Sequence, residues 1–519
     1  MRVTNKMMQS NALTNLNTNK ILKDKLNSQM LAESKIVRPS DDPVVAIRAL
    51  RLRTDLSMVT QYHEKNIPDA KSWLELTEKA VDGTADIIAE MKNLFSQGVQ
   101  DYNEPENRQN ILENLKSLRD AVYISGDSDY AGRQLFTGYR TDKRLSFLQN
   151  ETIPYKITEQ INKELIDTTI YVEKGDLSAA TGSTVQTDVS TNLVDRIRLS
   201  YDNLDSTVTP KIMIPKYDDP PTNSIPTLDA DKNAVYEEMP GVTITPVSKD
   251  DDPSPYLNVP ANEVRFVKET GELLLGKDVK NKLESLGKKE EIRIEYGKSE
   301  WAKGDLRPEH YFSCVSNEGA ANELIYNPDY LKSSMEARND TRQYIMYDVG
   351  FNQDMRVNTT ANECYTHAIG RDVDEMIGYL DELIDMHGQA DDLKTKISSG
   401  LYADTALEEL KTRYEATDKA LTYVADKVGK AFQNGLEKMQ GHLDKAALAL
   451  TNIGNRSSTL ELIENRIETQ KTSFTELKEE NEGVDTTEIL IKIESAEVAY
   501  EAALIATGKI VQNSLMNFI

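Results

Sequence analysis

Apolar side chains recur at alternating steps of three and four residues along two long parts of this chain, one near each end. In the first part the pattern occupies 45–63 and then 70–98. In the second part it occupies 436–477 and then 493–518. This heptad spacing places an apolar stripe along one side of each helix, so it predicts long helices that pack against one another.

Local signals mark where these helices begin, bend and end. Asp42-Pro43 predicts a helix start, because the Asp side chain accepts free backbone N–H groups and Pro suits the first helical position. Pro68 predicts a kink or break just before it. The sequence Asn-Glu-Gly at 481–483 predicts a break before a final helix. A further helix of modest amphipathicity is predicted at 3–33.

A second apolar stripe runs beside the seam at 70–98. It places apolar side chains on more than one side of that helix, which is typical of a bundle rather than of a two-stranded coil. The members of this stripe are Leu76, Ala80, Gly83, Ile87 and Leu94.

Between the two helical parts, residues 141–360 have a different character. Thirteen of the 17 prolines lie here, which excludes long helices and is typical of turns and loops. The runs 264–267, 272–275 and 291–296 have the apolar and β-branched composition of strands. Thr270-Gly271 predicts a hairpin turn between the first two, and a short helix is predicted between Gly276 and Lys288.

Together these patterns predict a mainly α protein with an inserted β-rich domain, in which the N- and C-terminal segments form a long antiparallel helical bundle. We expect five parts. They are a terminal assembly helix at 1–40, one half of the bundle at 41–140, the β-rich insert at 141–360, the other half of the bundle at 361–483, and a second terminal assembly helix at 484–519.

Composition narrows the classes of function. The 519 residues carry a formal charge of −25, which disfavours binding to nucleic acid phosphates. Residues 1–40 are nevertheless basic, with seven Lys or Arg against two Asp or Glu, so this end is either a membrane-surface helix or a solvated helix face. No run approaches the roughly 18 apolar residues of a membrane-spanning helix. The first residues lack the apolar stretch of a secretory signal, so we expect export without a cleaved signal or retention in the cytoplasm.

The sequence contains little that resembles a catalytic or metal site. The five histidines are scattered and none stands four residues from another, so no metal site is indicated. Asp41-Asp42 is explained by the helix cap. The stretch 304–312 gathers Asp, Arg, Glu and His and could be imagined as a site, although a turn that leads out of the insert explains it better. Cys314 and Cys364 are too few for a disulfide framework and are either bridged or free. We expect no enzyme activity and no cofactor.

Several short motifs, in order at both ends of the chain, resemble the flagellin superfamily of bacteria. They are the opening Met-Arg-Val-Thr-Asn-Lys-Met-Met, Pro-Ser-Asp-Asp-Pro at 39–43, Gln-Leu-Phe-Thr-Gly-Tyr-Arg-Thr at 134–141, and Ile-Gly-Asn-Arg at 453–456 before a long helix. The resemblance covers about 1–145 and 360–519. The Met-Met start and the Phe-Thr-Gly-Tyr motif favour the members that lie at the junction between hook and filament over the filament subunit.

The resemblance implies a structural role in the extracellular flagellum. It implies an adaptor that connects the hook-side junction protein to flagellin, associates with itself into a ring, and is exported by the flagellar type III apparatus with the help of a cytoplasmic chaperone. It also implies that the outermost segments are unfolded in the free subunit and order on assembly. The many Asn, Thr and Ser residues of 3–33 agree with this expectation.

The terminal helices would then provide the assembly interface. We predict that it includes Met7, Leu22, Leu26, Met30, Tyr500, Leu504, Val511, Leu515 and Phe518.

Three other functions remain open. A flagellin that forms the filament itself is the alternative within the family. A cytosolic coiled-coil scaffold would explain the seams and the charge, although it would not explain the paired terminal motifs. An adhesin or degradative enzyme carried on the insert would need an acid–base or metal cluster in 141–360, and the sequence there contains none that we recognise.

Overall fold

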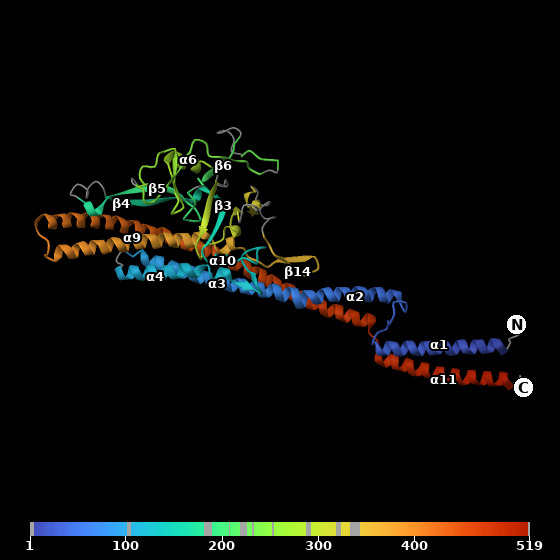
Figure 1. Cartoon of the computed structure of the whole chain (residues 1–519). Coiled ribbons are helices and arrows are strands. Elements are labelled where there is room, and N and C mark those ends of the chain that lie inside the picture. The colour runs from blue at the N-terminus through green and yellow to red at the C-terminus, as the bar shows by residue number, and fades with distance from the viewer. Residues whose placement is uncertain are drawn as a thin grey trace. The chain divides into compact units, whose positions relative to one another are not determined.

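The computed structural model describes residues 5–100, 105–180, 189–206, 208–217, 226–230, 233–251, 254–286, 292–317, 323–332 and 343–516. Helices dominate both ends of the chain and a β-rich insert separates them, which confirms the predicted fold class (Figure 1). The helices are α1 (Asn5–Leu31), α2 (Pro43–Gln61), α3 (Ile67–Gly98), α4 (Pro105–Val122), α6 (Lys277–Glu284), α8 (Ala361–Cys364), α9 (His367–Ser398), α10 (Asp404–Glu482) and α11 (Thr486–Met516).

The strands of the insert form two larger sheets. One has the order β4-β5-β10-β9-β8 and the other the order β13-β12-β3-β11-β6-β7. Their strands are β3 (Glu151–Ile161), β4 (Ile166–Glu173), β5 (Ser190–Arg198), β6 (Lys211–Pro215), β7 (Tyr236–Glu238), β8 (Thr243–Val247), β9 (Glu263–Val267), β10 (Glu272–Leu275), β11 (Ile292–Trp301), β12 (Ser313–Asn317) and β13 (Glu323–Tyr326). Two small hairpins pair β1 (Asp129–Tyr130) with β2 (Arg133–Gln134) and β14 (Met346–Gly350) with β15 (Gln353–Arg356).

One apolar core joins the two sheets. It includes Ile157 and Ile294 from the six-stranded sheet and Phe266 and Leu273 from the five-stranded sheet, and α6 adds Leu283. The predicted strands at 264–267 and 272–275 are confirmed as the antiparallel pair β9–β10, and the short helix predicted after them is α6. The third predicted strand is β11, although its expected first residue, Glu291, lies outside the described residues.

The chain divides into two compact units. The terminal unit consists of Met1–Lys71, Tyr347–Met355 and Ser458–Ile519, and the central unit consists of Ser72–Met346 and Arg356–Ser457. The terminal unit therefore holds α1, α2, α11 and most of the β14–β15 hairpin, whereas the central unit holds the two larger sheets of the insert with α4 and α9. The domain boundaries expected from the sequence remain predictions.

The start of α2 has the predicted cap. Asp42 Oδ1 accepts hydrogen bonds from the backbone N–H groups of Val44 at 3.0 Å and Val45 at 3.1 Å. Pro43 occupies the first helical position, where its missing N–H needs no partner.

The region before Pro68 differs from the prediction. The helix does not break there, because a π-helical turn at Tyr62–Asn66 joins α2 directly to α3. The N–H of Ile67 donates to the carbonyl of Tyr62, five residues earlier. This extra residue shifts the phase of the seam, so Tyr62 takes the buried position and the predicted seam residue His63 is only half-buried.

The seam predicted along α3 is confirmed. The last predicted member, Gly98, is half-buried. The other members are buried, and they are Ala70, Leu74, Thr77, Val81, Thr84, Ile88, Met91 and Phe95.

Two reciprocal contacts bring α3 and α10 close together. The rings of Phe95 and Phe432 meet edge to face at 5.7 Å. Each ring covers a glycine on the opposite helix, because a Cβ placed on Gly435 would lie 2.2 Å from Phe95 and one on Gly98 would lie 2.3 Å from Phe432. Both glycines therefore provide room for the partner ring.

We expect Gly435→Ala to destabilise the central unit by about 1–3 kcal/mol, because the new methyl group must displace a buried ring. The matched control is Gly441→Ala on the same helix, where nothing lies within 4 Å of the added Cβ. That change should stabilise the helix by about 0.5–1 kcal/mol. Urea unfolding followed by circular dichroism measures both, and equal midpoints for the two variants would contradict the close contact.

Candidate assembly surface

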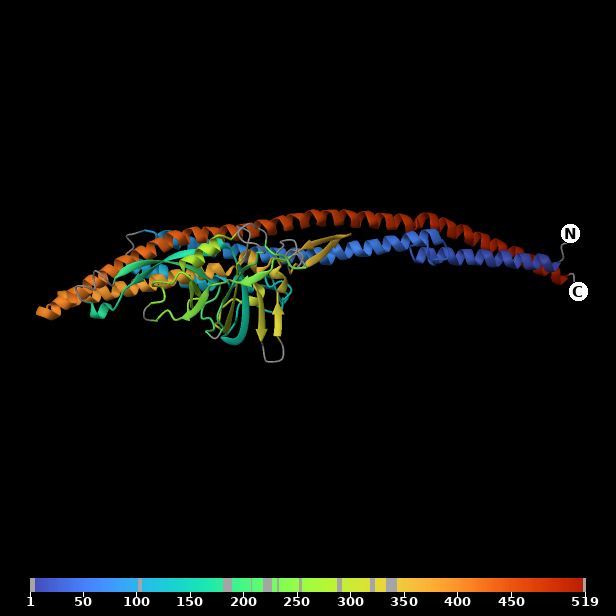
Figure 2. The ribbon, with the colours of Figure 1, turned by 90° about the horizontal axis from the view of Figure 1, so that it is seen from above.

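The first and last described helices form an antiparallel pair within the terminal unit. Near its middle, Lys23 Nζ lies 2.5 Å from Glu497 Oε1 and 5.9 Å from the centre of the Tyr500 ring. At the end of the pair where α1 ends and α11 begins, the backbone N–H of Lys35 donates to the carbonyl of Glu482 at 2.8 Å. The two helices lie side by side in both ribbon views (Figures 1 and 2).

Few apolar side chains hold this pair together. Leu26, Ile489 and Ala496 form its buried apolar cluster, with Val484 and Ile493 partly buried against it. Most of the remaining inward positions of α1 carry small or polar side chains such as Ala, Asn and Gln. Because burial of apolar area is the main favourable contribution to folding, the pair alone gains little stability.

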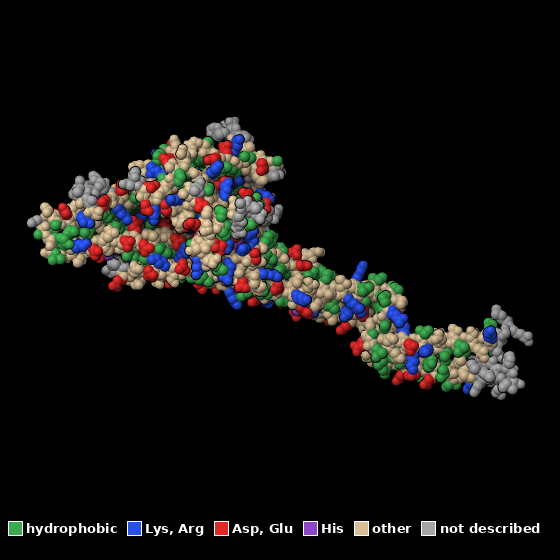
Figure 3. All heavy atoms as spheres, viewed as in Figure 1, with side chains coloured by type: hydrophobic (Ala, Val, Ile, Leu, Met, Phe, Trp, Pro, Cys, Tyr) green, Lys and Arg blue, Asp and Glu red, His purple; other side chains and the backbone are tan. Residues whose placement is uncertain are grey.

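Many apolar side chains of the same pair point into solvent instead, as the space-filling view shows (Figure 3). Exposed patches of this kind mark surfaces that bind a partner. On α1 they are Met7, Met8, Leu13, Ile21, Leu22, Met30 and Leu31, and on α11 they are Leu490, Ile491, Val498, Leu504 and Ile505.

The structure places the predicted interface residues in three groups. Met7, Leu22, Met30 and Leu504 are exposed, with between 39% and 51% of the surface of the first three accessible and 52% of Leu504. Leu26 is buried and Tyr500 is half-buried between the two helices of the same chain.

The third group consists of Val511, Leu515 and Phe518, whose side chains are not among those that the structure describes. Val511 and Leu515 belong to α11, but their side chains are not among those described, and Phe518 lies outside the described residues. The interface role of all nine residues remains a prediction. The sequence interpretation missed Ile491, Val498 and Ile505, although their spacing of seven residues is a signal that could have identified them.

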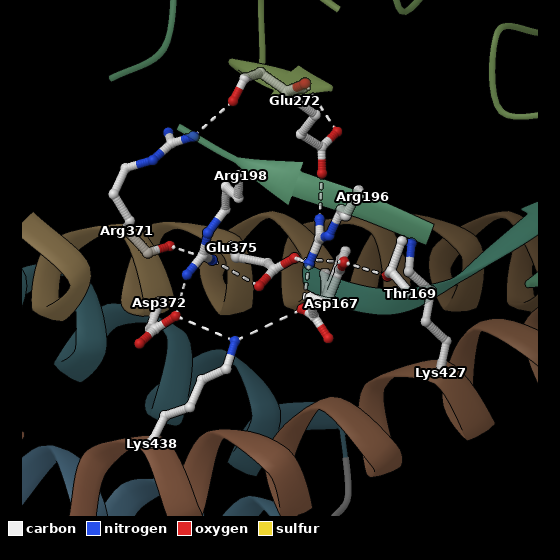
Figure 4. A network of polar contacts seen from close by, with 12 residues as sticks. Asp167, Thr169, Arg196, Arg198, Glu272, Arg371, Asp372, Glu375, Lys427 and Lys438 are labelled. Carbon is white, nitrogen blue, oxygen red and sulfur yellow. Dashed lines mark hydrogen bonds and ion pairs between the residues drawn. The ribbon is translucent and has the colours of Figure 1, made fainter. Parts of the chain in front are cut away.

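A separate group of charged side chains lies in the central unit, where the five-stranded sheet faces α9 and α10 (Figure 4). We call it the ionic cluster, and it consists of Asp167 on β4, Arg196 and Arg198 on β5, Glu272 on β10, Asp372 and Glu375 on α9, and Lys438 on α10.

Arg196 is the centre of the ionic cluster. Only 5% of its side chain is exposed, and it pairs with Glu272 and Glu375. Arg198 pairs with Asp372 and, at 2.8 Å, with Glu375 Oε2. These pairs join the sheet to α9 by charge, in addition to the apolar cluster of Val189, Met386 and Ala420 that also joins the insert to the helices.

The charges around the two α9 carboxylates change their acidity. Burial alone would raise the pKa of Glu375, but Arg196 and Arg198 outweigh it and lower that pKa to about 2. Burial also opposes ionisation of Asp372, yet a hydrogen bond from His442 and the charges of Arg198 and Lys438 hold its pKa well below the usual range. His442 Nε2 lies 2.8 Å from Asp372 Oδ2.

These lowered pKa values predict acid sensitivity of the central unit. A carboxylate whose pKa is lower in the folded state contributes stability above its unfolded pKa, which is about 4, and loses it as the pH falls through the folded value. Burial also lowers the pKa of His310 and His367, so stability should begin to fall below about pH 6.5, where these histidines are protonated in the unfolded chain only. The two carboxylates should add a steeper fall of the urea midpoint between about pH 4 and pH 2. The variant Asp372→Asn/Glu375→Gln should lose part of that slope, and an unchanged slope would contradict the charge account.

The stretch 304–312, considered above as a possible site, has a structural role. Asp305 Oδ2 lies 3.6 Å from the buried Lys298 Nζ, and the guanidinium of Arg307 lies 4.1 Å from the centre of the Phe147 ring. The His310 Nε2 is 3.0 Å from the carbonyl oxygen of Arg144, and burial lowers the pKa of this histidine to about 4. Arg307 also pairs with the buried Glu309 at 3.5 Å. These contacts hold the turn that follows β11 in place.

Other candidates for chemistry are equally limited. Cys314 and Cys364 are both free and buried, which resolves the alternative left open by the sequence. Within the described ranges, no three His, Cys, Asp or Glu side chains are grouped so that they could hold a metal ion. None of the helices in that part of the chain is both long and apolar enough to cross a membrane.

This chain is similar to known flagellar proteins. Residues 3–141 match the model of the bacterial flagellin N-terminal helical region. Flagellar hook-associated protein 3 of Salmonella typhimurium is 26% identical over 144 residues, which are 27% of this chain and 45% of that protein. The chain thus matches less than half the length of this curated relative.

The solved structures of flagellar hook-associated proteins are less similar to this chain in sequence. A putative flagellar hook-associated protein from Vibrio parahaemolyticus aligns with 85% of this chain and 100% of its own, at 12% identity and a TM-score of 0.33. The FlgL protein of Xanthomonas campestris aligns with 80% of this chain and 98% of its own, at 12% identity and a TM-score of 0.26. TM-scores this low do not establish a common fold.

The N-terminal match covers two of the motifs on which the resemblance was based, at 39–43 and 134–141. The resemblance to the flagellin superfamily, and within it to hook-associated protein 3, is therefore confirmed, and it is carried by residues 3–141, which are similar to the flagellin N-terminal helical region.

Proposed function

We propose that this chain is a structural component of the bacterial flagellum, an adaptor at the junction between hook and filament. It connects the hook-side junction protein to flagellin and associates with copies of itself into a ring. The single observation that carries this proposal is the α1–α11 pair, which has a small apolar core and a large exposed apolar surface. Such a pair is suited to gain its stability from neighbouring subunits.

The similarity to a relative named flagellar hook-associated protein 3 supports the same role. Within this role, residues 1–40 and 484–519 are terminal assembly helices, 41–140 and 361–483 are the two halves of the bundle, and 141–360 is the variable insert. The chain acts outside the cell, reaches its place through the flagellar type III apparatus with a cytoplasmic chaperone, and has no enzyme activity.

Removal of the protein from the cells that make it tests this function. We expect cells that assemble hooks but carry no filaments and release flagellin into the medium, and we expect the intact chain to restore the filaments. Normal filaments in the absence of the protein would contradict the proposal. If purified filaments consisted mainly of this chain, the alternative function as a flagellin would be correct.

A further inference from the structure

The outer side of α11, opposite to its contact with α1, carries a second seam. Ile491, Val498 and Ile505 stand seven residues apart and are 62%, 67% and 61% exposed. Glu494 and Glu501 lie between them at steps of three and four, and both are exposed. We call these five residues the α11 outer stripe. β-branched side chains at one position of a heptad are typical of a seam that packs against another helix.

The inner side of α11 already has its partner. Ile489 and Ala496 are buried against α1, and Tyr500 and Thr507 continue that side. The α11 outer stripe is therefore not needed for the helix pair of its own chain. Three exposed β-branched residues along one side of a helix would be unfavourable in water unless another molecule covered them.

The outer side of α2 has the complementary character. Val44, Ile47 and Leu50 are 62%, 59% and 61% exposed, although they lie on a helix whose other side is buried. Arg48 and Arg51 lie beside them and are also exposed, and neither forms an ion pair among the described residues. We call these five residues the α2 outer face. It combines apolar side chains with positive charge, whereas the α11 outer stripe combines them with negative charge.

Charge decides which surfaces fit together. Two copies of the α11 outer stripe would place glutamates against glutamates, and two copies of the α2 outer face would place arginines against arginines, which is unfavourable in both cases. The exposed side of α1 is a weaker match, because Ser10, Thr14, Asn17 and Ser28 occupy much of it. The α2 outer face is therefore the better partner for the α11 outer stripe.

We propose that the α11 outer stripe of one copy packs against the α2 outer face of a second copy, with glutamates of the stripe paired to arginines of the face. This inference rests on the proposed self-association. Because the two surfaces differ, the contact is head-to-tail, and each copy offers one free stripe and one free face. Such contacts continue from copy to copy and close into a ring or extend as a helix.

Cysteine cross-linking in isolated flagella tests this contact directly. Three full-length variants are compared, Ile47→Cys, Val498→Cys, and the variant with both changes, after treatment with a mild oxidant. We expect a ladder of dimers and larger species from the double variant and no cross-linked product from either single variant. The native Cys314 and Cys364 are buried, so the unchanged chain should give no ladder.

Each other outcome has a definite meaning. Dimers from a single variant would show a symmetric contact and would overturn the proposal, as would a cross-link confined to one chain. A double variant that is present in flagella but forms no ladder would also overturn it. If the unchanged chain is absent from isolated flagella, the proposed function itself fails, which is a distinguishable result. The control pair Lys65→Cys/Val498→Cys, with Lys65 outside the α2 outer face, should form no ladder.

Charge reversal adds an independent readout of incorporation into flagella. Arg48→Glu/Arg51→Glu and Glu494→Lys/Glu501→Lys should each reduce the amount of chain recovered with flagella, because like charges then face each other. The chain with all four changes should recover most of that loss, since opposite charges meet again. Failure of the fourfold variant to recover, with both parents reduced, would contradict the pairing of these two surfaces.

Discussion

A chain that lacks residues 1–35 should remain folded and fail to assemble. The physical reason is that α1 shares only a small apolar core with α11, so its removal exposes little further apolar surface in the rest of the chain. At the same time the deletion removes the exposed residues of α1 and leaves the inner side of α11 without its partner. We expect the same result for a chain that lacks 485–519.

The two tryptophans provide the control for this prediction. Trp73 and Trp301 are fully buried in the central unit, far along the sequence from both deletions. Their fluorescence and its urea midpoint should therefore match those of the intact chain, while the truncated protein is absent from isolated flagella. If either truncation abolishes the cooperative unfolding transition, the terminal helices belong to the folding core and the assembly argument fails.

Replacement of Arg196 by Met should destabilise the central unit by about 3–5 kcal/mol, because it leaves buried carboxylates without their cation. Glu272 and Glu375 both pair with this arginine, and 8% and 18% of their side chains are exposed. The urea midpoint reported by tryptophan fluorescence measures the change.

Two further variants separate charge from packing. Lys211→Met removes a pair with Glu238 in which both side chains are more than half exposed, so it should cost less than about 1 kcal/mol. Replacement of Arg196, Glu272 and Glu375 together by apolar residues of similar size should recover much of the lost stability. If Arg196→Met is as mild as Lys211→Met, the ionic cluster does not hold the insert to α9.

Local signals in the sequence predicted the helical parts well. The seam along α3 and the Asp42-Pro43 cap depend on residues close together in the chain, so periodicity and capping rules were sufficient for them. The β9–β10 hairpin was predicted for the same reason, since Gly271 adopts the positive φ of 67° that such a turn favours. The end of α10 at Glu482 agrees with the predicted break.

Features that depend on distant residues were not predicted. β3 pairs with β11 across more than a hundred intervening residues, and nothing local specifies that partner. The ionic cluster likewise brings Arg196 to Glu375. The π-helical turn at Tyr62–Asn66 was missed because the prediction considered only a kink or break at Pro68 and not an added residue. For the candidate assembly surface, the sequence interpretation predicted the terminal helices and left out the outer side of α11, although the seven-residue spacing of Ile491, Val498 and Ile505 is a local signal.

Immunogold electron microscopy with antibodies against residues 141–360 tests the central claim most directly. The account predicts label in one narrow zone at the base of each filament, where the hook ends. Label along the whole filament would contradict the junction role and indicate a flagellin, and label confined to the cytoplasm would contradict a flagellar role altogether.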